Sequence, residues 1–233
     1  MQLFNAFIKQ HGLEIYRRQG LILLLVAFAV SLAVGWFFQL SALTQHDHNF
    51  VIGFNAAWLN LTVLMLSIVI AINEQAFIQH WLTLYYLRKP SVRWLYSLRL
   101  LIYFMLSVSI SLAGALIVWL KGDDFFHTLW QFLMPITLML VLILWFSYAL
   151  RHTAQVIVAT GLTYVLLNSA DNLQQLIHNL WSQDAGLLSM IISAGLKLLP
   201  RLTIDDINSG LRWLCAAAAI VLLGLRSLKK TIQ

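Results

Sequence analysis

The chain has 233 residues, of which 61% are hydrophobic and 10% are charged, and its formal net charge is +6. An ordinary soluble domain is about one-quarter charged, so this composition excludes a soluble protein and indicates a membrane protein. The positive charge does not indicate nucleic-acid binding, because that function needs a basic face on a soluble domain and none is present.

The first 18 residues predict a helix that lies in the membrane interface. Leu3, Phe4 and Phe7 lie near one face of this helix, and its charged residues are available to water. The apolar run that follows, at about 20–40, is long and lacks a clear small-x-small cleavage site. We therefore expect this run to remain in the mature protein as the first membrane span.

Four apolar runs are long enough to cross about 30 Å of hydrocarbon, and two weaker runs are counted with them. The six predicted spans lie at about 20–40, 51–73, 98–120, 128–150, 153–168 and 209–228. The fifth is short, but if it did not cross, the basic residues at the end of the chain would lie on the outer side. The predicted fold class is therefore all-α, with residues 1–233 forming a single polytopic transmembrane domain.

The charge distribution predicts the orientation of this domain. Basic residues in short loops mark the cytoplasmic side. Most of the 15 lysines and arginines fall in one alternate set of connections, and most of the acidic residues fall in the other. We expect both termini in the cytoplasm and the protein in a bacterial inner membrane.

The connection between the second and third spans is predicted to contain a short amphipathic helix. From Glu74 to Leu87 the chain has no proline or glycine, and bulky apolar residues recur at helical spacing until Pro90. Two interpretations stay open. The helix either anchors its aromatic and basic side chains among lipid headgroups, which composition slightly favours, or it docks into a cytoplasmic partner.

The connection between the fifth and sixth spans, from Asn168 to Gly210, is too long for a turn and too apolar for disorder. Residues 173–180 predict one amphipathic helix. Residues 187–199 predict a second helix that enters the membrane without crossing it, and Pro200 ends it. We expect this helical connection on the outer side.

The sequence around the second connection carries a resemblance to a known family. Glu74 is followed by the helix FIQHWLTLYYLRK and then by Pro90-Ser91-Val92-Arg93, and KLLPRLTIDDI at 197–207 contains a Leu-Leu-Pro turn. With the layout described above, this order resembles the permease subunit of type-2 ABC exporters. In that family, acidic residues, a Gly-Thr-Leu-Glu-like helix and a Pro-Val-Ser-Arg turn follow the second span. This chain has WLTL at 81–84 in place of Gly-Thr-Leu-Glu, and only Glu74 in place of the paired acids.

The resemblance implies that residues 74–93 form a coupling helix that a separate ATP-binding subunit receives. The docking residues would be Glu74, Trp81, Tyr85, Arg88, Lys89, Pro90 and Arg93. ATP hydrolysis would lie on the partner, since the chain has no GxxxxGK[ST] phosphate loop. A second permease copy, or a homologous permease, would complete the pathway. Two alternatives stay open: a six-span component of haem or cofactor-precursor export, and a membrane scaffold without a transport role.

Uncharged polar residues within the spans are candidates for a substrate pathway. On the second span these are Asn55, Asn60, Thr62 and Ser67. Such residues most often mediate helix contacts in lipid, and that interpretation is the more common one. If they line a pathway at the dimer interface, the lack of charge favours a lipid-like, amphiphilic or peptide-like substrate over a small inorganic ion.

Catalytic and metal chemistry have little support in the sequence. His46, Asp47 and His48 could bind zinc or copper, but no further ligands lie nearby, so we expect solvated loop residues. The apolar runs have no charged residue in their middles, no GxSxG and no HExxH. We expect no enzyme activity and no cofactor. The lone cysteine, Cys215, is expected to be a small core residue.

Overall fold

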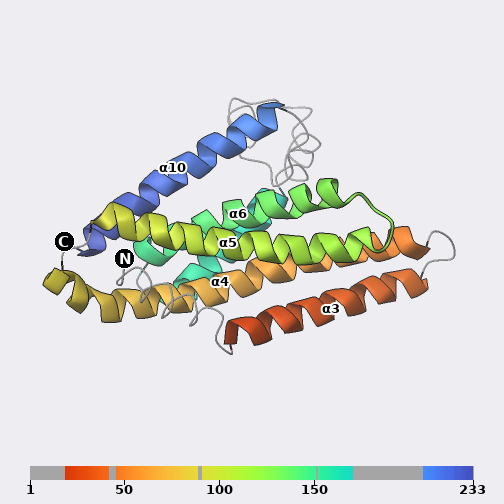
Figure 1. The fold of residues 1–233 in the computed structure, drawn as a ribbon, viewed down its shortest axis with the longest axis horizontal. Coiled ribbons are helices and arrows are strands. Elements are labelled where there is room, and N and C mark those ends of the chain that lie inside the picture. Colours follow the sequence, from red (N-terminus) through yellow and green to blue (C-terminus); the bar gives the residue numbers. More distant parts are fainter. Residues whose placement is uncertain (1–18, 42–45, 89–90, 151, 170–206, 233) are drawn as a thin grey trace, which may run out of the picture.

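The computed structural model describes residues 19–41, 46–88, 91–150, 152–169 and 207–232. Within these ranges the chain folds into six helices: α3 Gln19–Ser41, α4 His46–Arg88, α5 Val92–Trp119, α6 Phe125–Ala149, α7 Thr153–Asn168 and α10 Ile207–Ile232. Figure 1 shows them as an elongated bundle. The predicted interfacial helix at 1–18 and the outer connection at 170–206 lie outside the described residues.

Five of these helices, all except α7, are long and apolar enough to cross a membrane. The prediction of an all-helical fold is therefore confirmed for the described residues, and five of the helices could span a membrane by length and composition. The bounds of α7 coincide with the predicted fifth span, but its 16 residues are about 24 Å long, which is shorter than about 30 Å of hydrocarbon. The count of six spans stays a prediction.

Helix α4 differs from the prediction in its continuity. The second span and the helix after it were expected as two elements, but α4 runs through 43 residues from His46 to Arg88 without a break. A helix of this size is about 65 Å long, roughly twice the hydrocarbon thickness. The physical reason lies in the sequence, because neither glycine nor proline occurs between Gly53 and Pro90.

Helix α6 lies at the centre of the bundle and is its most buried helix. It packs against α4, α5, α7 and α10, whereas α3 packs on α4. The fully buried side chains of α6 include Ile136, Leu138, Leu140, Ile143 and Leu144. These residues belong to the two apolar core clusters to which α6 contributes.

Polar caps fix the starts of α5 and α6. The Ser91 side chain accepts a hydrogen bond from the Trp94 amide at 3.3 Å, so α5 begins directly after Pro90. At the other end of the bundle, Asp124 accepts hydrogen bonds from the amides of Phe126 and His127 at the start of α6. Gly122, in the turn between the two helices, has φ 91°, a conformation that suits glycine.

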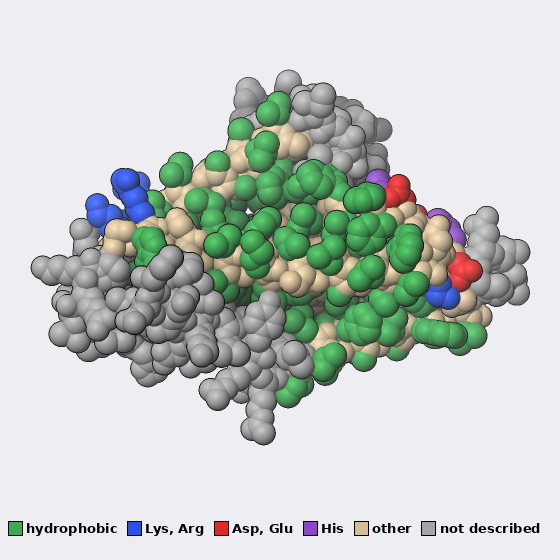
Figure 2. All heavy atoms as spheres, in the orientation of Figure 1, with side chains coloured by type: hydrophobic (Ala, Val, Ile, Leu, Met, Phe, Trp, Pro, Cys, Tyr) green, Lys and Arg blue, Asp and Glu red, His purple; other side chains and the backbone are tan. Residues whose placement is uncertain are grey.

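The surface of the bundle is largely apolar. Figure 2 shows hydrophobic side chains over the middle of one face, basic side chains at one end, and acidic, basic and histidine side chains at the other. Large exposed apolar residues are frequent on α3, α5 and α10. Cys215 on α10 is also exposed in the described structure, so the expectation that it is a core residue is wrong.

Candidate functional site

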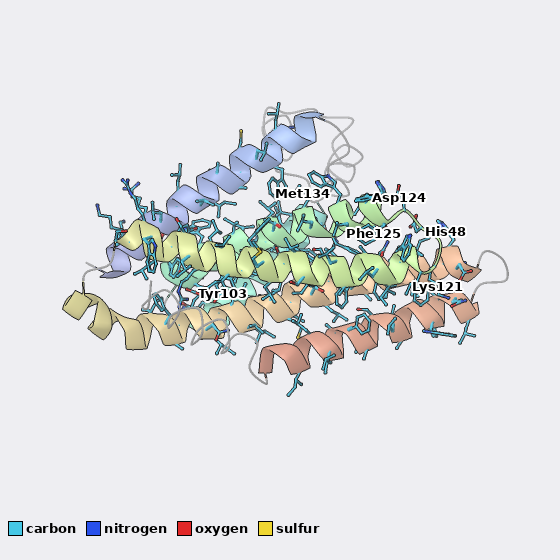
Figure 3. All side chains as sticks on the ribbon, viewed as in Figure 1. His48, Tyr103, Lys121, Asp124, Phe125 and Met134 are labelled. Carbon is cyan, nitrogen blue, oxygen red and sulfur yellow. The ribbon has the colours of Figure 1, made fainter. Side chains whose placement is uncertain are left out.

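Four polar side chains meet inside the bundle near the C-terminal half of α4. These residues, called the buried cluster below, are Glu74 on α4, Arg99 and Tyr103 on α5, and Tyr148 on α6. Arg99 and Tyr103 are four residues apart and therefore lie on the same face of α5. Figure 3 labels Tyr103, which lies far along the bundle from His48, Lys121 and Asp124.

The Glu74 carboxylate is the centre of the buried cluster, and its side chain is 0% exposed. One oxygen, Oε1, forms an ion pair with Arg99 Nη1 and accepts a hydrogen bond from the Tyr103 hydroxyl at 2.6 Å. The other oxygen, Oε2, accepts a hydrogen bond from the Tyr148 hydroxyl at 2.5 Å. Each carboxylate oxygen is thus bound to a different neighbouring helix.

Two neighbours of Glu74 on α4 extend these contacts. Arg99 is 4% exposed, and its guanidinium lies over the Phe77 ring, with 3.4 Å between its Cζ and the ring centroid. The Gln75 amide donates hydrogen bonds to the carbonyls of Ser147 at 3.2 Å and Leu150 at 3.1 Å. Carbonyls at the end of a helix lack partners within it, so Gln75 satisfies the end of α6.

The contacts of the buried cluster join helices and leave neither oxygen of Glu74 free for chemistry on a ligand. The positive and negative charges compensate each other, and both carboxylate oxygens are occupied by donors of the protein. Within the described ranges, no group of three or more His, Cys, Asp or Glu side chains could hold a metal ion. The arrangement can hold three helices together at one height.

The burial of Glu74 revises two expectations. Glu74 was expected on a docking surface, but its carboxylate has no exposed surface in the described structure. Glu74 was also expected just after the second span, yet it lies within the part of α4 that could span a membrane, at 47–78. The predicted second span ended before Glu74, whereas the part of α4 that could span continues to Ile78, and α5 and α6 supply polar partners for the Glu74 carboxylate.

A signal for the pair existed in the sequence. Glu74 and Arg99 carry opposite charges at the two ends of one helical connection, and Tyr103 follows Arg99 by one helical turn. Tyr148 is 74 residues from Glu74, and no local pattern links the two. The ion pair could therefore have been predicted from the sequence, whereas the contact of Glu74 with Tyr148 on α6 could not.

The remaining predicted docking residues lie beyond the buried cluster. Trp81, Tyr85 and Arg88 are on the last turns of α4, whose backbone is described and whose side chains are not. Lys89 and Pro90 lie outside the described residues. Arg93 is exposed on the first turn of α5.

The four predicted pathway residues do not share one surface. Thr62 and Ser67 are buried inside the bundle, and Asn55 is half-buried. Asn60 is exposed and accepts a hydrogen bond from the Tyr164 hydroxyl of α7 at 2.7 Å. These positions favour the interpretation that such residues mediate helix contacts.

Small and polar residues also meet where α4 faces α5. The Trp58 indole lies so close to Gly114 that a Cβ atom added at that glycine would be 2.2 Å from Trp58 Nε1. Among the described residues, Trp58 Nε1, Thr62 Oγ1 and Ser111 Oγ are buried without a hydrogen-bond partner. Ser111 and Gly114 are three residues apart, on the same face of α5.

The histidine-containing segment lies at the other end of the bundle. His46, Asp47 and His48 form the first turn of α4, so the expectation that they belong to a loop is wrong. Asp47 and His48 are exposed, and Asp47 forms an ion pair with Lys121 at 3.2 Å. An exposed pair of this kind contributes little to stability, about 0–1 kcal/mol.

Comparison with known proteins identifies no relative, because the chain matches no family model, no curated protein and no solved structure.

Proposed function

We propose that this chain is the membrane-spanning permease subunit of an ATP-driven exporter, and that a separate subunit hydrolyses ATP. The observation that carries the proposal is the continuation of α4 beyond the part that could span the membrane. That part ends at Ile78, whereas the helix ends at Arg88. Residues 79–88, called the arm below, add about 15 Å of helix.

The continuity of α4 favours docking over an interfacial location. A helix that lies among lipid headgroups runs along the membrane surface, so a break or a turn has to separate it from the span before it. The described backbone of α4 has no such break between His46 and Arg88. A continuous helix instead carries its end away from the membrane, where a cytoplasmic subunit can bind it.

The charges at the end of the arm give the proposed orientation. Arg88 and Lys89 end the helical connection, and Arg93 is exposed at the start of α5. The last turn of α10, which contains Lys229 and Lys230, lies at the same end of the bundle (Figure 1). Basic residues mark the cytoplasmic side, so this end faces the cytoplasm of the proposed bacterial inner membrane.

The exposed apolar faces suit the remaining proposed partners. Helices α3 and α10 leave many of their apolar side chains exposed on the described chain. In a membrane these faces contact lipid, and a second permease copy or a homologous permease covers part of them in the proposed dimer. The arms of the two copies would then bind two ATPase subunits, and ATP-driven closure of these subunits would move the arms.

The proposal is tested by capture of an ATPase. The full-length chain is purified in mild detergent with an ATP-binding-cassette ATPase encoded beside it, and binding is measured. Arg88→Glu should abolish binding, because it reverses the charge at the end of the arm. Lys121→Glu makes the same change at the other end of the bundle and should leave binding intact.

Absence of any bound ATPase would overturn the exporter and favour the scaffold. Orientation is tested separately in a Cys215→Ala background, with a cysteine placed at the exposed Arg93 position. A membrane-impermeant thiol reagent added outside the cell should not label it, and labelling would contradict the proposed topology.

A further inference from the structure

We propose that the buried cluster makes the arm rigid relative to α5 and α6, so that displacement of the arm moves three helices as one unit. The inference rests on the proposed function for the source of the displacement. The rigidity itself is a property of this chain alone. The residue at its centre, Glu74, is a positioning residue that acts through its helix partners.

The position of the buried cluster along α4 is the first support. Glu74 is four residues before Ile78, the last residue of the part of α4 that could span the membrane. The polar contacts of α4 with its neighbours at this height come from Glu74, Gln75 and Phe77, which together occupy one helical turn. This turn lies just before the arm, so contacts here determine whether the arm can move independently of α5 and α6.

The division of the Glu74 carboxylate between two helices is the second support. Oε1 binds Arg99 and Tyr103 of α5, and Oε2 binds Tyr148 of α6. One carboxylate therefore fixes α4 to both neighbours, and α4 cannot shift relative to α5 and α6 without breaking bonds of the same carboxylate to both. Hydrogen bonds to a charged group in a dry site are stronger than neutral ones, so all three helices resist separation.

The attachment of Gln75 is the third support. Its amide binds the carbonyls of Ser147 and Leu150, which lie on either side of Ala149, the last residue of α6. Helix α7 begins at Thr153, only a few residues later. Movement of the arm therefore reaches the corner between α6 and α7 as well as the body of α6.

The test measures distances between spin labels in the full chain, in lipid nanodiscs and a Cys215→Ala background. One label replaces Thr83 on the arm. The second replaces either Ser97 on α5 or His152 beside the end of α6, and both of these side chains are exposed. In the otherwise unchanged chain, both label pairs should give a single narrow distance distribution.

The diagnostic variant combines Tyr148→Phe with Gln75→Ala. It removes the hydrogen bonds of Glu74 and Gln75 to α6 and keeps the ion pair with Arg99. The distribution between positions 83 and 152 should lose its narrow peak, while that between 83 and 97 stays narrow. Tyr164→Phe is the matched control, because Tyr164 is a buried tyrosine outside the buried cluster, and it should broaden neither distribution.

The outcomes separate this inference from the proposed function. If the diagnostic variant leaves both distributions narrow, the buried cluster does not hold the arm and the inference is wrong, whether or not an ATPase binds. If the 83–152 distribution broadens and an ATPase binds, the variant should retain binding but lose substrate-stimulated ATP hydrolysis. If no ATPase binds the unchanged chain, the exporter is wrong, and the distances still decide the rigidity of the arm.

Discussion

Replacement of Arg99 by methionine should destabilise the protein strongly. Methionine keeps an apolar side chain against Phe77 but removes the positive charge from the Glu74 carboxylate. Both side chains of the pair are almost fully buried, so water cannot replace the lost partner. Breaking a buried ion pair by removing one member costs about 3–5 kcal/mol, and we expect a loss of this size.

The double variant Glu74→Gln with Arg99→Met gives the sharper result. Each single change leaves an uncompensated polar or charged group, and if the two costs were additive the double variant would lose about 6–10 kcal/mol. Because the double variant has no buried charge, its loss should instead be smaller than that of Arg99→Met alone. The comparison needs only the order of the two stability losses, that of the double variant and that of Arg99→Met, and not their absolute values.

The measurement is the free energy of unfolding in mixed micelles, with circular dichroism to verify that each variant is helical before denaturation. Arg93→Met is the matched control, because it makes the same substitution on the same helix at an exposed position. Exposed substitutions usually change stability by less than about 0.5 kcal/mol. If Arg99→Met lowers the free energy of unfolding no more than Arg93→Met does, the buried ion pair does not contribute to stability. The proposed rigidity of the arm then loses its main support.

Two further predictions concern packing outside the buried cluster. Gly114→Ala should destabilise the protein by about 1–3 kcal/mol, because the added Cβ would overlap the Trp58 indole. Gly161→Ala should be neutral or stabilising by up to about 1 kcal/mol, because no atom lies within 4 Å of the added Cβ. Equal effects of the two substitutions in thermal unfolding would contradict the close contact between Gly114 and Trp58. Tyr164→Phe should cost about 1 kcal/mol, because it removes the hydrogen bond that joins α7 to Asn60 on α4. An unchanged unfolding free energy would indicate that this bond is absent in the membrane.

The helices were predictable to the extent that hydrophobic run length determines them. The bounds of α7 match the predicted fifth span, and the ends of α6 lie within a few residues of the prediction, because Asp124 supplies a cap where the apolar run begins. The continuity of α4 was not predicted. A hydropathy window ends at the first polar residues, although a helix continues as long as its backbone is unobstructed.

The candidate site was less predictable than the helices. Glu74 was selected from the sequence as a notable residue, but its expected surroundings were those of a surface. Its burial depends on Tyr148, a residue of another helix that no periodicity connects to α4. Charge compensation inside a bundle is a tertiary property, so sequence patterns locate the charged residues without showing that they meet.

The separation of these partners along the chain has a consequence for biosynthesis. Arg99 follows Glu74 by 25 residues and Tyr148 follows it by 74, so α4 leaves the ribosome before the groups that stabilise its carboxylate. An unpaired carboxylate is costly in hydrocarbon, so we expect the nascent helix to keep Glu74 at the water boundary until α5 and α6 have been inserted. The last turns of α4 should then reach their final depth late, and truncated chains that end before Tyr148 should be preferred substrates of membrane proteases.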